Sequence, residues 1–260
     1  MALTYASYLK VDDLLKLQVP KSEPEQHDEL LFITIHQVYE LWFKQMLHEL
    51  GKVAGDFDRG DTFGAIATLK RLCTIMKTLV GQLDILETMT PLSFSSFRDR
   101  LESSSGFQSV QFREFEYVLG YKRPDMLKYH AEGGEGRLRL ERKLREPSLV
   151  DHFYNFLAQH GVDVPDALRK KDAEQPNVAD ESMQDEILRL YKSRGELQIL
   201  FELMTDFDEG LQEWRYRHVK LVERAIGNKK GSGGSLGVDF LKRSLFLSIF
   251  PDLWAIRHRL

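Results

Sequence analysis

Residues 27–57 read HDELLFITIHQVYELWFKQMLHELGKVAGDF, and the order of apolar residues in this stretch decides the fold class. Apolar side chains recur at steps of three and four residues, as they do on one face of an α-helix. They are Leu31, Phe32, Ile35, Val38, Leu41, Trp42, Met46, Leu50, Val53 and Phe57. The spacing predicts a long helix with a wide apolar face. Ser22 and Glu25 are expected to cap its start, with Pro24 in the first turn.

The same periodicity continues along the rest of the chain. A second helix is predicted over 62–88, and Thr90 followed by Pro91 is typical of the start of a short helix that extends to Leu101. Further helical patterns cover 107–119, 137–145, 147–160, 182–206 and 207–227. No segment alternates apolar and polar residues as a strand does. We therefore expect an all-α fold, a single-domain helical bundle of long amphipathic helices spanning residues 1–260.

Two segments interrupt the helical pattern. Residues 162–181 contain two prolines and several charges, which predicts an irregular surface excursion. Residues 231–237, GSGGSLG, resemble a phosphate-binding loop, but no lysine follows the glycines and a helix rather than a strand precedes them. A nucleotide site is therefore disfavoured. The glycines are consistent with a flexible linker, or with a loop that closes over a ligand.

Composition excludes several classes of protein. The 260 residues are 42% hydrophobic and 29% charged, as in ordinary globular domains. The net charge of −4 is spread along the chain, so binding to nucleic acid or to an anionic membrane is not expected. The only cysteine is Cys73, which excludes an intrachain disulfide and a cysteine-rich metal site. The sequence shows no signal peptide and no apolar run of membrane-spanning length, so we expect a cytoplasmic protein.

His218 lies on an apolar helical face. It shares that face with Leu211, Trp214, Leu221 and Val222. A lone histidine in such a position is more often a hydrogen-bonded core residue than a ligand. The alternative is that a single imidazole projecting into a dry cavity is the axial ligand of a haem iron. A zinc site would need further ligands nearby.

Two other side chains are candidates for contact with a small ligand. His36 follows Phe32 by one helical turn, so it is either a core histidine or a group that accepts an N–H from an aromatic ligand. Arg98 follows Phe94 by four residues, which places a ring and a guanidinium on one helical face. That pair suits a ligand with an apolar body and a carboxylate. Spacing alone favours a solvated surface arginine.

Several strings are together specific enough to indicate a family. They are TYASYL at 4–9, HDELLFITIHQVYELWFKQ at 27–45, SGFQSVQFR at 105–113, WRYRHV at 214–219 and the glycine-rich loop at 231–235. With these strings the chain resembles the tryptophan 2,3-dioxygenase family from near its start to Trp254. The match is weakest across 122–181.

The resemblance implies an all-α enzyme that binds haem b and forms a homotetramer. Enzymes of this family insert both atoms of O₂ across the C2–C3 bond of the indole ring of L-tryptophan and form N-formylkynurenine. This reaction opens the kynurenine pathway of tryptophan catabolism. The long helices are then expected to enclose a haem pocket.

The resemblance also implies roles for individual residues. His218 matches the proximal haem ligand, and His36 matches the distal, catalytic histidine that accepts the indole N–H. Phe32, Phe94 and Leu101 match positions that line the substrate pocket, and Arg98 matches the arginine that binds the substrate carboxylate. Ser232 stands where the family usually has a threonine that contacts the substrate. Tyr5 and Tyr8, within a docking segment at 1–20, match tyrosines that reach into a neighbouring subunit's pocket.

Two alternatives accompany this interpretation. A haem-dependent indole monooxygenase on the same scaffold would share the haem and much of the pocket, but would add one oxygen atom instead of two. A non-catalytic helical binding module would keep the scaffold and bind no haem. The chain also departs from the family at Ser232, which lacks a methyl group, and at residues 102–104, which are more polar than usual.

Overall fold

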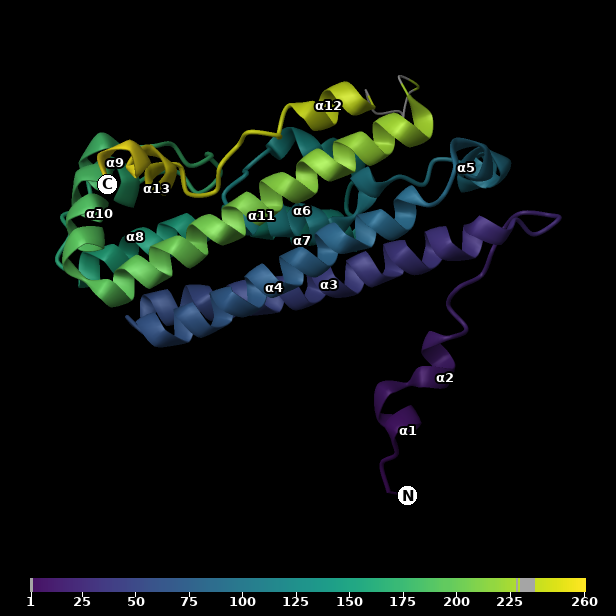
Figure 1. The fold of residues 1–260 in the computed structure, drawn as a ribbon, viewed down its shortest axis with the longest axis horizontal. Coiled ribbons are helices and arrows are strands. Elements are labelled where there is room, and N and C mark those ends of the chain that lie inside the picture. The colour runs from purple at the N-terminus through teal and green to yellow at the C-terminus, as the bar shows by residue number, and fades with distance from the viewer. Residues whose placement is uncertain (1, 228, 230–236) are drawn as a thin grey trace.

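Three long helices form the body of the protein. The computed structural model describes residues 2–227, 229 and 237–260. The long helices are α3 (His27–Asp58), α4 (Thr62–Glu87) and α11 (Gly195–Ile226). α3 and α4 form an antiparallel hairpin, and α11 lies along α4 and runs in the same direction (Figure 1). Because α4 contacts both of the other helices, side chains from distant parts of the sequence reach one interior.

The boundaries predicted for the first helices agree with the structure to within one residue. The stretch 27–57 is helical to Asp58, and the predicted helix over 62–88 ends at Glu87. Thr90 caps α5 (Pro91–Arg98), since its hydroxyl accepts a hydrogen bond from the backbone N–H of Ser93 at 3.1 Å. α5 continues into the 3-10 turn η1 (Asp99–Leu101), so the chain is helical to Leu101 with a tighter last turn.

The predicted cap of α3 is wrong. The residue before α3 is Gln26, and its side chain makes no capping hydrogen bond. Ser22 instead donates its hydroxyl to the buried carboxylate of Glu29 and accepts the backbone N–H of Gln26 at 2.9 Å. The chain before α3 therefore folds back onto the first helical turn, and Glu29 takes the role that the sequence pattern gave to Glu25.

The hydrophobic core lies where α3, α4, α8 and α11 meet. Its fully buried side chains include Met46, Leu50, Phe57, Leu69, Leu72, Phe201 and Phe207. Each such side chain contributes about 1.5–3 kcal/mol by leaving water. The apolar stripes predicted for residues 27–57 and 62–88 are therefore mostly the faces that the helices bury, with Leu41, which is 54% exposed, as an exception.

Shorter helices surround this core. They are α6 (Val110–Val118), α7 (Glu135–Arg145), α8 (Leu149–Gln159), α9 (Asp166–Arg169), α10 (Glu181–Ser193), α12 (Val238–Lys242) and α13 (Pro251–Ala255), with 3-10 turns η2 (Gly106–Gln108), η3 (Pro124–Tyr129) and η4 (Arg257–Arg259). All regular structure within the described ranges is helical, which confirms the all-α prediction. Residues 162–181 hold α9 and the first residue of α10, and begin with the buried Val162 and Val164. No helix in the described ranges has the length and apolarity needed to cross a membrane.

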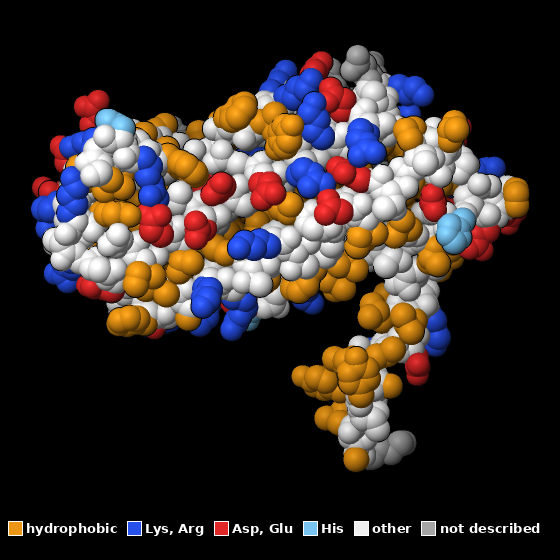
Figure 2. All heavy atoms as spheres, viewed as in Figure 1, with side chains coloured by type: hydrophobic (Ala, Val, Ile, Leu, Met, Phe, Trp, Pro, Cys, Tyr) orange, Lys and Arg blue, Asp and Glu red, His pale blue; other side chains and the backbone are white. Residues whose placement is uncertain are grey.

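An N-terminal arm, residues 2–20, extends away from the body (Figure 1). It carries the short helices α1 (Tyr5–Leu9) and α2 (Val11–Leu14). Tyr5 and Tyr8 are 78% and 72% exposed, and apolar side chains gather on the arm in Figure 2. Gln37 of α3 holds the base of the arm by donating a hydrogen bond to the carbonyl oxygen of Leu17 at 3.0 Å. The arm therefore presents aromatic surface that its own chain does not cover.

Candidate functional site

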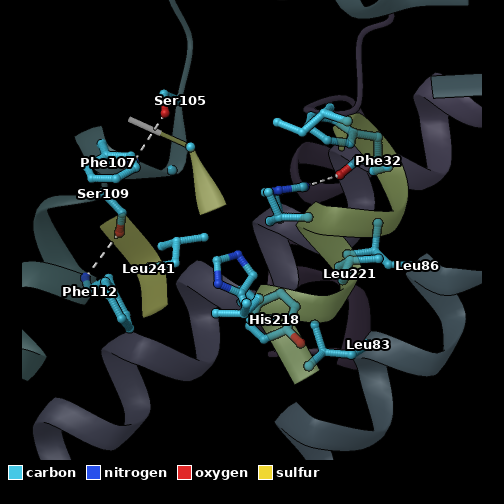
Figure 3. Close-up of a pocket in the computed structure, with 18 of the residues that line it drawn as sticks. Phe32, Leu83, Leu86, Ser105, Phe107, Ser109, Phe112, His218, Leu221 and Leu241 are labelled. Atoms are coloured by element: carbon cyan, nitrogen blue, oxygen red, sulfur yellow. Dashed lines mark hydrogen bonds between the residues drawn. The ribbon is translucent and has the colours of Figure 1, made fainter. Parts of the chain in front are cut away.

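A cavity of about 600 Å³ lies beside the N-terminal half of α3 and the C-terminal ends of α4 and α11 (Figure 3). Its volume is in the range of small-molecule and cofactor sites. α5 and α6 close it on opposite sides, and α12 contributes Phe240 and Leu241 to its wall. Apolar side chains supply most of the lining surface, and the polar part comes from histidines, arginines, carboxylates and several serines and threonines. Such a lining suits a large flat ligand that is anchored at a few points.

His218 projects from α11 into this cavity, with Leu83, Leu86 and Leu221 around it in Figure 3. Trp214, one turn earlier on α11, stacks on its ring with centroids 5.1 Å apart and planes 10° apart. Burial, together with the nearby His36, lowers the pKa of His218 to about 4. The imidazole is therefore neutral at physiological pH and has a lone pair available for a metal. No residue of the described ranges hydrogen-bonds this ring, which favours the ligand interpretation over a hydrogen-bonded core histidine.

His36 reaches the same cavity from α3. Its Nδ1 lies 2.7 Å from the carbonyl oxygen of Phe32, which can only accept, so Nδ1 carries the proton. The Nε2 atom is then a hydrogen-bond acceptor. Burial lowers the pKa of His36, and the Phe32 carbonyl and Glu40 oppose this shift only in part. The geometry thus holds His36 as a neutral acceptor, with its ring accessible from the cavity.

Aromatic rings from α3 and α5 form one wall of the cavity. The Phe32 ring lies 4.0 Å from the His36 ring, 5.7 Å from the Phe94 ring and 5.6 Å from the Phe97 ring, as centroid distances. Arg98 and Leu101 follow on α5 and η1 and line the same side. The wall therefore combines a flat apolar surface with one guanidinium.

The structure brings together six of the residues singled out in the sequence. Phe32, His36, Phe94, Arg98, Leu101 and His218 all line this cavity. Tyr5 and Tyr8 do not, because the arm carries them away from their own chain's cavity. Ser232 lies outside the described residues.

The wall formed by α6 carries a cluster of charges that the sequence analysis did not identify. Arg113 and Glu116 of α6 are only 3% and 4% exposed and form an ion pair. Arg123 donates to both carboxylate oxygens of Glu116 at 3.0 and 2.8 Å, and Arg215 of α11 has its Nη2 4.0 Å from the same carboxylate. We call these four residues the α6 charge cluster. Each of them lines the cavity.

The α6 charge cluster has an excess of positive charge. Three guanidiniums share the one carboxylate of Glu116. The Nε atoms of Arg113 and Arg123 are buried and have no hydrogen-bond partner. Burial lowers the pKa of Arg113, and Glu116 opposes that shift by favouring the charged form. In sequence, Arg113 and Glu116 look like an ordinary surface pair at i and i+3, so no signal marked them as buried.

A second polar contact missed in sequence ties α6 to α3. Gln111 donates its side-chain amide to the backbone carbonyl oxygen of Glu40 at 2.9 Å and to the Glu40 carboxylate at 2.8 Å. Glu40 lines the cavity one helical turn after His36. The contact fixes the distance between the α3 and α6 walls.

The residues present fit haem b. A single neutral imidazole suits an iron whose other ligands come from a macrocycle, and the apolar walls suit the faces of the ring. The described residues contain no group of three or more histidine, cysteine, aspartate or glutamate side chains that could hold a bare metal ion.

Known proteins resemble this chain over nearly its whole length. The profile of the family described as "Tryptophan 2,3-dioxygenase" matches residues 1–198 and 189–260. A protein of Herpetosiphon aurantiacus named tryptophan 2,3-dioxygenase is 52% identical over 256 residues, which are 98% of each chain. Proteins with the same name from Anaeromyxobacter sp. (strain K) and Caulobacter vibrioides are 50% and 43% identical, over 98% and 99% of this chain and 96% and 98% of theirs.

Proposed function

Because the chain belongs to the tryptophan 2,3-dioxygenase family, we propose that the cavity between α3 and α11 is its active site, with the roles given below. The protein is a haem-dependent dioxygenase. It inserts both atoms of O₂ across the C2–C3 bond of the indole ring of L-tryptophan to give N-formylkynurenine, the first step of the kynurenine pathway. The observation that supports the site is that His218 and His36, from different helices, line one cavity.

His218 would hold the iron through its neutral imidazole. Haem b supplies the chemistry of O₂ activation when it is bound. Trp214 limits rotation of the His218 ring, because the two rings stack nearly parallel. A fixed ring plane would keep the ligand nitrogen directed into the cavity.

His36 orients the indole ring. Its Nε2 accepts the indole N–H, since Nδ1 is already committed to the Phe32 carbonyl oxygen. The hydrogen bond sets which edge of the ring faces the reacting oxygen. His36 need not remove the indole proton, because attack at the ring carbons leaves the nitrogen protonated.

The remaining pocket residues bind the rest of the substrate. Phe32, Phe94 and Leu101 bury the indole ring and exclude water, while Arg98 pairs with the carboxylate through two parallel hydrogen bonds. Holding both ends fixes C2 and C3 near the reacting oxygen, which is the main gain available from positioning.

Further proposals extend beyond one chain's described residues. Ser232 would contact the substrate's amino acid group, by the resemblance of its loop to that of the family. Tyr5 and Tyr8 would complete the pocket of a neighbouring subunit in a homotetramer, which is consistent with their exposure on the arm. Residues 1–260 would form one domain, with the protein located in the cytoplasm.

One experiment tests the proposed reaction. Purified protein is loaded with haem, reduced to the ferrous form and mixed with L-tryptophan and O₂, and the mass of the product is measured by mass spectrometry. We expect substrate mass plus two oxygen atoms, and a Soret band that shifts on tryptophan addition. A gain of one oxygen atom would indicate the monooxygenase, and failure to take up haem would indicate the binding module.

A further inference from the structure

The α6 charge cluster has no role in the chemistry described so far. It lies on the α6 side of the cavity, next to Phe112, which Figure 3 places across the cavity from Phe32. Arg98, by contrast, belongs to the Phe32 side. The cavity therefore has cationic groups on two separate walls, and only the Arg98 wall is assigned to a ligand.

The charges in the α6 charge cluster do not balance. Arg113, Arg123 and Arg215 carry three positive charges, and Glu116 carries one negative charge. Two other buried carboxylates are already occupied: Glu114 pairs with Arg139 at 2.6 Å, and Asp208 accepts the backbone N–H groups of Ile249 and Phe250 and the Trp254 indole N–H. Asp125, which also favours the charged form of Arg113, is exposed to solvent. A buried cation without a counter-charge is costly. The cluster therefore has room for additional negative charge from the cavity side.

The donors that remain point to a carboxylate. Arg215 is committed elsewhere, because its Nη1 donates to the carbonyl oxygens of Ser244 and Leu247 and its guanidinium stacks on Tyr121 at 4.2 Å. Arg113 and Arg123 keep buried Nε atoms with no partner. Arg113 donates to Glu116 through Nη1 and Arg123 through Nη2, which leaves Nη2 of Arg113 and Nη1 of Arg123 to donate to the oxygens of a further carboxylate.

We propose that Arg113 and Arg123 form a carboxylate-binding site on the α6 wall, and that its occupant is a propionate group of the cofactor. This inference rests on the proposed function, since it takes haem b as the ligand of His218. Arg215 lies one turn before His218 on α11, so the cluster flanks the position of the axial ligand. The substrate carboxylate is the other possible source of the same chemistry, and the experiment separates the two.

The test compares haem b with its dimethyl ester, in which both propionates are neutral. Arg113→Gln and Arg123→Gln are loaded with each form, and transfer of haem to an excess of an acceptor protein is followed at the Soret band. We expect haem b to leave each variant about 10- to 100-fold faster than it leaves the wild type, which corresponds to the loss of one charge-assisted hydrogen-bonded pair. With the diester we expect the same rate in all proteins. Arg189→Gln, at an exposed pair with Glu186, is the matched control and should change nothing.

A purely structural role predicts a different result. If the cluster only supports the fold, both haem forms will leave the variants faster to the same extent. The midpoint temperature of thermal unfolding of the haem-free variants will then also fall. That outcome overturns the proposal. Arg123→Gln guards against misfolding of Arg113→Gln, because Arg123 is 28% exposed and its replacement leaves Glu116 paired with Arg113.

Substrate binding distinguishes the two sources of carboxylate. If the cluster binds the substrate instead, haem retention will be unchanged, and L-tryptophan affinity will fall while tryptamine affinity does not. That result keeps the carboxylate site but assigns it a different occupant. If the variants match the wild type in both haem retention and substrate affinity, the carboxylate site itself is overturned. Failure of the wild type to retain either haem form contradicts the proposed function instead, and is seen before any variant is made.

Discussion

Replacing His36 with alanine tests the most specific contact in the proposed mechanism. In the structure, the Nδ1–H of His36 is used by the Phe32 carbonyl oxygen at 2.7 Å, so Nε2 is the atom left to meet a ligand. His36 does not contact the iron in the proposed arrangement. We therefore expect His36→Ala to retain haem and lose affinity for L-tryptophan.

The size of that loss follows from what replaces the imidazole. The ring is accessible from the cavity, so water can enter the space that the alanine leaves and accept the indole N–H in its place. An exchanged hydrogen bond is worth about 0.5–1.5 kcal/mol, and an indole N–H left without any partner costs about 1–3 kcal/mol. Since about 1.4 kcal/mol is a factor of ten in Kd, we expect tryptophan to bind about tenfold more weakly.

The assay is a tryptophan titration followed at the Soret band, with haem content measured on the same samples. Titration with 1-methyltryptophan provides an independent test, because its methyl group replaces the indole proton that His36 accepts. The wild type should prefer tryptophan over the methylated analogue, and His36→Ala should lose most of that preference. His48→Ala, on the exposed face of the same helix, is the control. An unchanged preference in His36→Ala would refute the role of His36 as acceptor, and loss of haem would show that its role is structural.

Four further predictions follow from the same site. His218→Ala should fail to hold haem in five-coordinate form, and a normal Soret band with normal haem retention would contradict its assignment. Arg98→Lys keeps a charge but loses the two-pronged geometry, so tryptophan should bind more weakly and tryptamine nearly as before; equal weakening of both would mean that Arg98 only supports the pocket. Deleting residues 1–10 should leave a helical, haem-binding protein with reduced tryptophan affinity and a looser oligomer by light scattering, and unchanged affinity would exclude Tyr5 and Tyr8 from the pocket. The pKa of His36 is lowered by burial below its ordinary value of 6.5, so tryptophan affinity should hold at that pH and fall at lower pH, as protonation turns Nε2 into a donor; a fall that begins above pH 6.5 would contradict this.

The helices could be predicted from the sequence because their apolar stripes are long and regular. The prediction for 27–57 differs from α3 by one residue, since every third or fourth side chain there enters the core. The cap at Ser22 was wrong because a cap depends on the path of the chain before the helix. The carboxylate that Ser22 meets, Glu29, follows one full turn later than the capping pattern requires.

The site was only partly predictable, for a related reason. Helical spacing places His36 and His218 on apolar faces, but a residue that lines a cavity and one that fills a core have the same spacing. The family resemblance, rather than periodicity, separated these two possibilities. No such pattern marked Arg113, because an arginine and a glutamate three residues apart are usually solvated.

The α6 charge cluster also bears on how the cavity is kept open. A cavity lined by apolar side chains alone gains by collapsing, since each buried side chain contributes to stability. Arg113, Glu116 and Arg123 oppose this collapse, because moving charged groups further into an apolar interior is costly. Tyr39 adds to this effect on the opposite helix, because its hydroxyl donates to the carbonyl oxygen of Leu79 at 2.6 Å and ties α3 to α4. A ligand that brings negative charge to the α6 wall therefore stabilises the folded chain through the same groups that hold the cavity open. Binding of that ligand is then coupled to the ordering of the side chains in the α6 wall.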